Sequence, residues 1–211
     1  MRAHNSSPIQ GLLAAAAMVA ATLLAISQAS AADATPLSMA TGGPTLPPFG
    51  WTKFCIERPQ ECQTEPAAER EVALSVSAWA ELERINKWVN ATIKPKRDLE
   101  HYGEVDKWTY PDDGYGDCED YVLLKRRMLM EAGWPREALL ITVVIDHNGE
   151  GHAVLTVRTD RGEFLLDNLR EDIVPATKSS YRFIKRQLQT NPNFWVSLGG
   201  PRSTVATAAS R

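Results

Sequence analysis

One cysteine, Cys118, stands among acidic residues in the segment GYGDCEDYVLLKRRML. Asp117 and Glu119 flank the thiol, and Asp120 follows one residue later. Asp117 is a good helix N-cap residue, and Asp120, three positions on, completes a capping box with a shorter acid than usual. This pattern places Cys118 at the first position of a helix, where the positive end of the helix dipole favours a thiolate. Cys118 is therefore a candidate nucleophile.

A thiolate nucleophile needs a general base, and the base needs a group that orients it. His152 follows the turn sequence NGEG and opens the apolar run HAVLTVRT, which would hold the imidazole at the start of a strand. The next run, EFLLDN, carries Asp167 near its end. If a two-residue loop at 160–161 joins the two strands, Asp167 lies one diagonal step from His152 on the same face. A three-residue loop would turn Asp167 to the other face.

The elements around these residues follow from the periodicity of the chain. Apolar residues recur at three- and four-residue steps from Val72 to Val89, which predicts an amphipathic helix that ends before Pro95. We expect its indoles, Trp79 and Trp88, to lie in the core.

Residues 94–115 are polar and rich in turn formers, which predicts a loop that carries Trp108. A second helix is then predicted from about Cys118 to Ala132, with Gly133 as its stop.

Short β-branched and aliphatic runs follow the second predicted helix. ALLITVVID, HAVLTVRT and EFLLDN are separated by turn sequences, which predicts an antiparallel meander. YRFIKRQ and FWVSL predict two more strands, although the first of these runs is also compatible with a helix. Helices followed by strands indicate an α+β domain in which helices pack on one face of an antiparallel sheet.

The N-terminus has the layout of a secretory signal peptide. Arg2 precedes an apolar run at 11–26, and Ala29-Ser30-Ala31 fits a cleavage site. The run is shorter than the roughly 20 apolar residues that a membrane anchor needs. We expect cleavage after residue 31 and export to the periplasm, without a membrane anchor in the mature chain.

Composition divides the rest of the chain into three parts. Residues 32–48 are rich in Pro, Gly, Ala and Thr and are predicted to be disordered. Residues 49–200 are the predicted domain, and residues 201–211 a loose tail. The formal net charge of −3 leaves no basic surface for nucleic acid.

Three cysteines are present in a chain predicted to enter an oxidising compartment. Cys55 and Cys62 lie close together in FCIERPQEC, and we expect them to form a disulfide. Cys118 is then left as a free thiol, which is either a buried inert residue or a reactive one.

The runs GYGDCEDYVLLKRRML and TVVIDHNGEGHAVLTVRTDRGEFLLDN closely resemble the bacterial transglutaminase-like cysteine proteinases. The resemblance extends from about Phe49 to Leu198. It implies a papain-like or transglutaminase-like core with a Cys-His-Asp triad, in which Cys118 is the nucleophile, His152 the base and Asp167 the orienting group.

The best-understood members of this family are periplasmic proteases that cleave large adhesins, release cells from biofilms and need calcium. The resemblance therefore implies Ca²⁺ held by Asp117, Glu119 and Asp120 beside the nucleophile. It also implies a periplasmic or cell-surface protein as substrate and a membrane-bound regulatory protein as a second partner.

Other readings of the same residues stay open. Asp117 and Asp120 can serve as helix caps alone, with Glu119 facing solvent. A transglutaminase or amidase would use the same triad, and a calcium-dependent envelope binding protein could keep the scaffold without catalysis. In an endopeptidase the oxyanion would be held by the Cys118 backbone N–H and a second donor, for which Trp108 is a candidate.

Overall fold

The computed structural model describes residues 38–63 and 65–199. The signal peptide predicted for residues 1–31 and the tail predicted for residues 201–211 lie outside the described residues. The described residues belong to one compact unit. Every helix in this part of the chain is too short or too polar to cross a membrane.

A seven-stranded antiparallel sheet forms the centre of this unit, with the strand order β1-β9-β8-β4-β5-β6-β7. Its strands are β1 (Thr41–Thr45), β4 (Leu139–Ile145), β5 (Gly151–Thr159), β6 (Gly162–Leu166), β7 (Val174–Pro175), β8 (Arg182–Leu188) and β9 (Asn191–Leu198). The short strands β2 (Lys94–Pro95) and β3 (Tyr115–Gly116) form a separate parallel pair.

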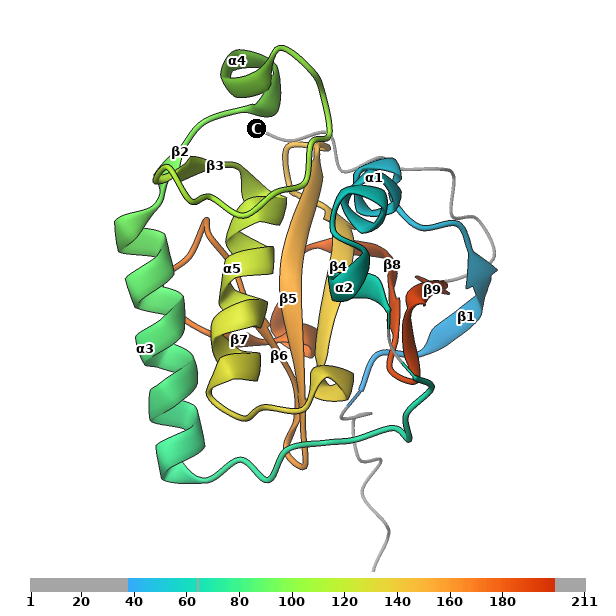
Figure 1. The fold of residues 1–211 in the computed structure, drawn as a ribbon. Helices are drawn as coiled ribbons and strands as arrows, with labels where there is room; N and C mark the ends of the chain where they lie inside the picture. The colour runs from blue at the N-terminus through green and yellow to red at the C-terminus, as the bar shows by residue number, and fades with distance from the viewer. Residues whose placement is uncertain (1–37, 64, 200–211) are drawn as a thin grey trace, which may run out of the picture. The chain divides into compact units, whose positions relative to one another are not determined.

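The α-helices of the described residues are α1 (Phe49–Glu57), α2 (Pro59–Cys62), α3 (Val76–Thr92), α4 (Asp98–Tyr102) and α5 (Cys118–Glu131). Two short 3-10 helices lie in connections, η1 (Arg136–Ala138) between α5 and β4 and η2 (Ala176–Lys178) between β7 and β8. Helix α5 packs along β5, and α3 lies beside α5 (Figure 1). Alternate strand residues such as Ile141, Ala153 and Leu155 enter one core cluster with residues of α1, α3 and α5. The predicted α+β class, with helices on one face of an antiparallel sheet, is confirmed.

Helix α3 begins later than the apolar pattern predicts. The side chain of Ser75 caps it by accepting a hydrogen bond from the Ala78 amide at 3.1 Å. Val72 therefore lies before the helix, where it pairs with Thr159 in an isolated bridge. The prediction that Trp88 is a core residue is wrong, because the buried stripe of α3 bypasses it and leaves the indole 48% exposed.

The hairpin between β5 and β6 has the two-residue loop that places His152 and Asp167 on one face. Thr159 pairs with Gly162, and Leu155 pairs with Leu166. The strand reading of YRFIKRQ is also confirmed, since these residues form most of β8, between β4 and β9. The predicted second helix agrees with α5, which ends at Glu131. Gly133 follows shortly after it with a backbone φ of +94°.

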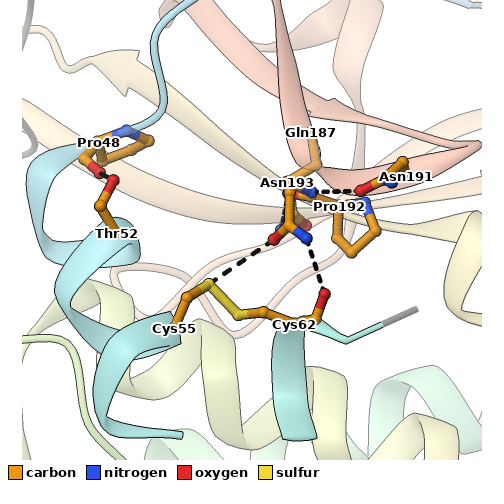
Figure 2. The surroundings of a disulfide bond; sticks show 8 residues. All are labelled: Pro48, Thr52, Cys55, Cys62, Gln187, Asn191, Pro192 and Asn193. Atoms are coloured by element: carbon orange, nitrogen blue, oxygen red, sulfur yellow. Dashed lines mark hydrogen bonds between the residues drawn. A yellow bond between two sulfur atoms is a disulfide. The ribbon is translucent and has the colours of Figure 1, made fainter. Parts of the chain in front are cut away.

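The predicted disulfide joins α1 to α2. Cys55 and Cys62 are bonded with their Cα atoms 5.5 Å apart, and Cys118 is free. Figure 2 shows that Asn193 of β9 reaches this bridge, where its Nδ2 donates to the Cys62 carbonyl at 2.7 Å. This hydrogen bond holds the end of α2 against the sheet.

The segment predicted to be disordered contains β1, so that prediction is wrong for Thr41–Thr45. Composition misleads here because backbone pairing with β9 requires no apolar side chain. Gly42 lies so close to β9 that a Cβ atom there would sit 2.4 Å from Ser197 Oγ.

Candidate active site

Cys118 is the first residue of α5, and the capping box predicted for this helix is present. Asp117 accepts from the Asp120 amide, and Asp120 Oδ2 accepts from the Asp117 amide at 3.4 Å. A Cβ atom at Gly116 would sit 2.8 Å from the Asp120 side chain, so only glycine allows this close approach. The capping box thus sets the direction in which the Cys118 side chain leaves the helix.

The thiol of Cys118 is buried, with only 2% of the residue exposed. It donates a hydrogen bond to Glu119 Oε2 at 3.0 Å, and the backbone N–H of Ala153 faces the sulfur. Burial raises the thiol pKa well above its usual value, and the charges of Glu119 and Asp117 raise it further. Among these neighbours the thiol keeps its proton.

His152 and Asp167 form a buried pair at the sheet end where β5 begins. His152 Nε2 lies 2.8 Å from Asp167 Oδ1. The same carboxylate accepts from the Leu169 amide at 3.0 Å and from the Tyr181 hydroxyl at 2.6 Å. Burial opposes ionisation of Asp167, but these hydrogen bonds outweigh it and lower the pKa of the carboxyl. An ionised Asp167 requires a proton on Nε2, which leaves Nδ1 of His152 as the basic nitrogen.

Cys118 and His152 line one pocket of about 370 Å³. Its other walls come from the β4–β5 turn, the loop after β6 and the segment before β8, which includes Tyr181. The fold therefore brings the predicted nucleophile and the predicted base to the same cavity, with Asp167 hydrogen-bonded to the imidazole.

Asp117 and Asp120 meet a third carboxylate that the sequence did not point to. Asp98, the first residue of α4, places an oxygen within 4.8 Å of oxygens of both. We call Asp98, Asp117 and Asp120 the carboxylate cluster. The only sequence signal for Asp98 was its place in a polar loop. Hydrophobic periodicity does not predict which loop residues lie close to another element.

Glu119 does not belong to the carboxylate cluster, which differs from the predicted set of ligands. It is fully buried and forms a second group with Asp117 and Cys118. Asp117 belongs to both groups. The alternative in which Glu119 faces solvent is therefore wrong. Its side chain accepts a hydrogen bond from the thiol, on a helix that packs against β5.

The carboxylates around Cys118 resist ionisation. Burial, with the charge of Asp117, raises the pKa of Asp98 to about 7 and that of Asp120 to about 9. Burial likewise raises the pKa of Glu119 well above its usual value. Asp98 Oδ1 and Glu119 Oε1 are buried without a hydrogen-bond partner. Crowded, buried oxygens of this kind suit a hard divalent cation such as Ca²⁺.

Trp108 is not the second oxyanion donor. Its Nε1 donates to Asp106 Oδ1 at 2.8 Å, and the indole is buried beside Trp51 at a ring distance of 6.0 Å. The prediction fails because the aromatic core around α1 takes up the ring. Two histidines outside the pair are also engaged, since His101 bonds Asp113 and His147 stacks on Tyr181.

Comparison with known proteins assigns a family to most of the chain. The family model "Bacterial transglutaminase-like cysteine proteinase" matches residues 41–203. A comparison with curated proteins finds no match.

Among solved structures, the chain is similar to three of Legionella pneumophila LapG. The calcium-bound form is 23% identical with a TM-score of 0.49, covering 61% of this chain and 74% of LapG. A second LapG structure is 26% identical with a TM-score of 0.45, and the match covers 51% of this chain and 64% of LapG. EGTA-treated LapG is 26% identical with a TM-score of 0.45, and the match covers 51% of this chain and 62% of LapG.

Proposed function

The chain belongs to the bacterial transglutaminase-like cysteine proteinases and is a cysteine peptidase, and we propose that it is an endopeptidase that uses Cys118, His152 and Asp167. The observation that carries this proposal is the buried His152–Asp167 hydrogen bond beside a pocket that Cys118 also lines. The pair supplies an oriented base, and the pocket gives a peptide access to the thiol.

The residues act in a defined order in this proposal. His152 Nδ1 takes the Cys118 proton, and the thiolate attacks the peptide carbonyl carbon. The imidazolium then protonates the leaving amine as the C–N bond breaks, which leaves an acyl-enzyme thioester. His152 next removes a proton from water as that water attacks the thioester, and Cys118 leaves as a thiolate, which releases the carboxylic acid product. The thiolate then takes the proton back from His152, which restores the resting enzyme. Asp167 holds the Nε2–H throughout and stabilises the imidazolium.

We further propose that the enzyme depends on calcium held by the carboxylate cluster, with Glu119 beside it. The pKa shifts support this, because each carboxyl resists ionisation in the absence of a cation. A bound Ca²⁺ supplies positive charge that lets the acids ionise and offsets their repulsion of the thiolate. The side chains of Asp117 and Asp120 meanwhile keep α5 capped and the nucleophile in place.

The proposed substrate is a periplasmic or cell-surface protein, in line with adhesin release and biofilm control, and the proposed regulatory partner is membrane-bound. Support comes from the disulfide, which suits an exported chain, and from the signal-peptide pattern of residues 1–31. We propose residues 49–200 as the peptidase domain, extended by β1, which completes its sheet.

Peptide N-terminal mapping tests the function directly. Wild-type protein and Cys118→Ala are each incubated with periplasmic extract, Ca²⁺ and a fluorescent primary amine. New protein N-termini with wild type alone would support an endopeptidase. Amine incorporation into glutamines without new N-termini would favour the transglutaminase alternative. Identical results with both proteins would favour the non-catalytic binding protein.

A further inference from the structure

Tyr181 contacts the proposed catalytic pair although it lies outside both strands of the hairpin. It precedes β8, and its hydroxyl donates to Asp167 Oδ2 at 2.6 Å. The other carboxylate oxygen, Oδ1, accepts from His152 Nε2 at 2.8 Å. Each oxygen of Asp167 thus has a side-chain donor of its own, and a hydroxyl at this distance is typical of a charge-assisted hydrogen bond.

The ring of Tyr181 also borders the imidazole. It stands edge to face against His152, with centroids 5.7 Å apart and an angle of 67° between the planes. His147 stacks on the same ring at 6.3 Å, nearly parallel at 8°. Tyr181 lines the pocket that contains Cys118. The ring therefore limits how the imidazole can tilt within the pocket.

We propose that Tyr181 is a positioning residue of the peptidase: its hydroxyl fixes the Asp167 carboxylate against His152, and its ring holds the imidazole toward Cys118. This inference rests on the proposed function, because it assigns Tyr181 a role in the same reaction. Tyr181 acts through Asp167 and His152 and does not itself exchange a proton. Burial and the hydrogen bond to Asp167 raise its pKa, so the phenol remains a donor at neutral pH.

Several charged groups besides Tyr181 face Asp167. Lys125 of α5 is buried with an Nζ atom that has no hydrogen-bond partner, and it interacts electrostatically with the carboxylate. In the loop after β6, Arg170 and Asp172 pair with each other at 2.8 Å and also act on Asp167. Replacing the Tyr181 hydroxyl leaves these three groups in place.

Besides Asp167, two charges act on Tyr181 itself: Arg170 lowers the pKa of the phenol, and Asp146 of the β4–β5 turn raises it. Burial and the bond to Asp167 outweigh Arg170, so the hydroxyl stays protonated. A change in the pH response of a Tyr181→Phe protein therefore reports the lost hydrogen bond to Asp167.

The test measures the rate at which iodoacetamide alkylates Cys118 in the full chain with Ca²⁺ present, from pH 4 to pH 9. Tyr181→Phe keeps the ring and loses the hydroxyl, which removes a stabilising bond to the Asp167 anion. We expect the acidic limb of the rate profile to move up by about one to two pH units. Tyr181→Leu, which also loses the ring, should be slower than Tyr181→Phe across the whole range. Thr177→Ala, an exposed residue of η2 four positions earlier and outside the lining of the Cys118 pocket, is the matched control and should follow wild type.

A double-variant cycle separates positioning from a general structural effect. In an Asp167→Asn background, Tyr181→Phe should change the alkylation rate by less than twofold, since the carboxylate it serves is gone. An undiminished effect in that background, or a Tyr181→Phe profile that superimposes on wild type, would overturn the positioning role alone. If His152→Ala alkylates as fast as wild type, the proposed function itself falls, and the role of Tyr181 falls with it.

Discussion

The backbone N–H of Asp98 donates a hydrogen bond to Asp117 Oδ2 at 3.2 Å, and this bond joins the start of α4 to the start of α5. It brings a third acid next to the capping box that orients Cys118. The cluster therefore couples the polar loop before α5 to the position of the nucleophile. Any ion or proton that binds there acts on both.

Calcium should stabilise the protein more at high pH than at low pH. The pKa of Asp98 is raised from 3.8 to about 7 in the folded protein, so its contribution to stability is present below pH 4 and is lost as pH rises to 7. Asp120 extends this loss toward pH 9. In the proposed site, Ca²⁺ would bind the ionised acids and compete with these protons.

Thermal melts in EGTA and in Ca²⁺ at pH 5 and pH 8 measure this effect. At a free Ca²⁺ concentration 100-fold above Kd, the ion should add about 2.7 kcal/mol. The gap between the two melting temperatures should be wider at pH 8. Mg²⁺ should not replace Ca²⁺, because it gives up its water shell reluctantly. Equal melting temperatures with and without Ca²⁺ at both pH values would refute the calcium site.

Replacing Asp98 should have opposite effects on the metal-free and calcium-bound proteins. In EGTA, Asp98→Asn should unfold at the same temperature as wild type or higher, because a buried carboxyl no longer resists ionisation. The Ca²⁺ concentration for half-maximal stabilisation should rise on the order of tenfold. Glu100→Gln, an exposed acid of the same helix, is the control for charge alone and should leave both values unchanged. Calcium titrations followed by melting temperature give both quantities.

The three proposed catalytic residues should differ in how much activity their loss removes. Cys118→Ala and His152→Ala should abolish peptide-bond cleavage. Asp167→Asn should keep a weakened enzyme, slower by about two to four orders of magnitude, because the amide can hold the wrong tautomer of the imidazole. Initial rates on a substrate found by N-terminal mapping, with circular dichroism as a check on folding, measure this order. Full activity in His152→Ala would remove the proposed mechanism.

Loss of the disulfide should cost stability and leave the thiol chemistry intact. Cys55 and Cys62 are seven residues apart, and closing so short a loop is worth about 2 kcal/mol. Urea unfolding of the Cys55→Ser/Cys62→Ser protein should show that decrease. The alkylation rate of Cys118 in the folded protein should match wild type, since the bridge lies on α1 and α2 and the residues that line the Cys118 pocket come from other elements. A large fall in that rate would show that the bridge supports the site.

Local sequence patterns predicted much of the fold and part of the candidate site. The capping box at Asp117, the start of α5 at Cys118 and the two-residue loop after Thr159 depend on neighbours in the chain. Side chains in such elements repeat every 3.6 or 2 residues, so sequence spacing alone predicted which ones share a face.

Contacts between distant segments were decided only in three dimensions. Asp98 joins Asp117, Tyr181 bonds Asp167, and Glu119 turns inward to the thiol, yet none of these has a local signature. The same is true of β1, whose backbone pairs with β9 at the other end of the described chain. Such contacts depend on how the helices pack on the sheet, because packing decides which loops meet and which polar groups must find partners away from water.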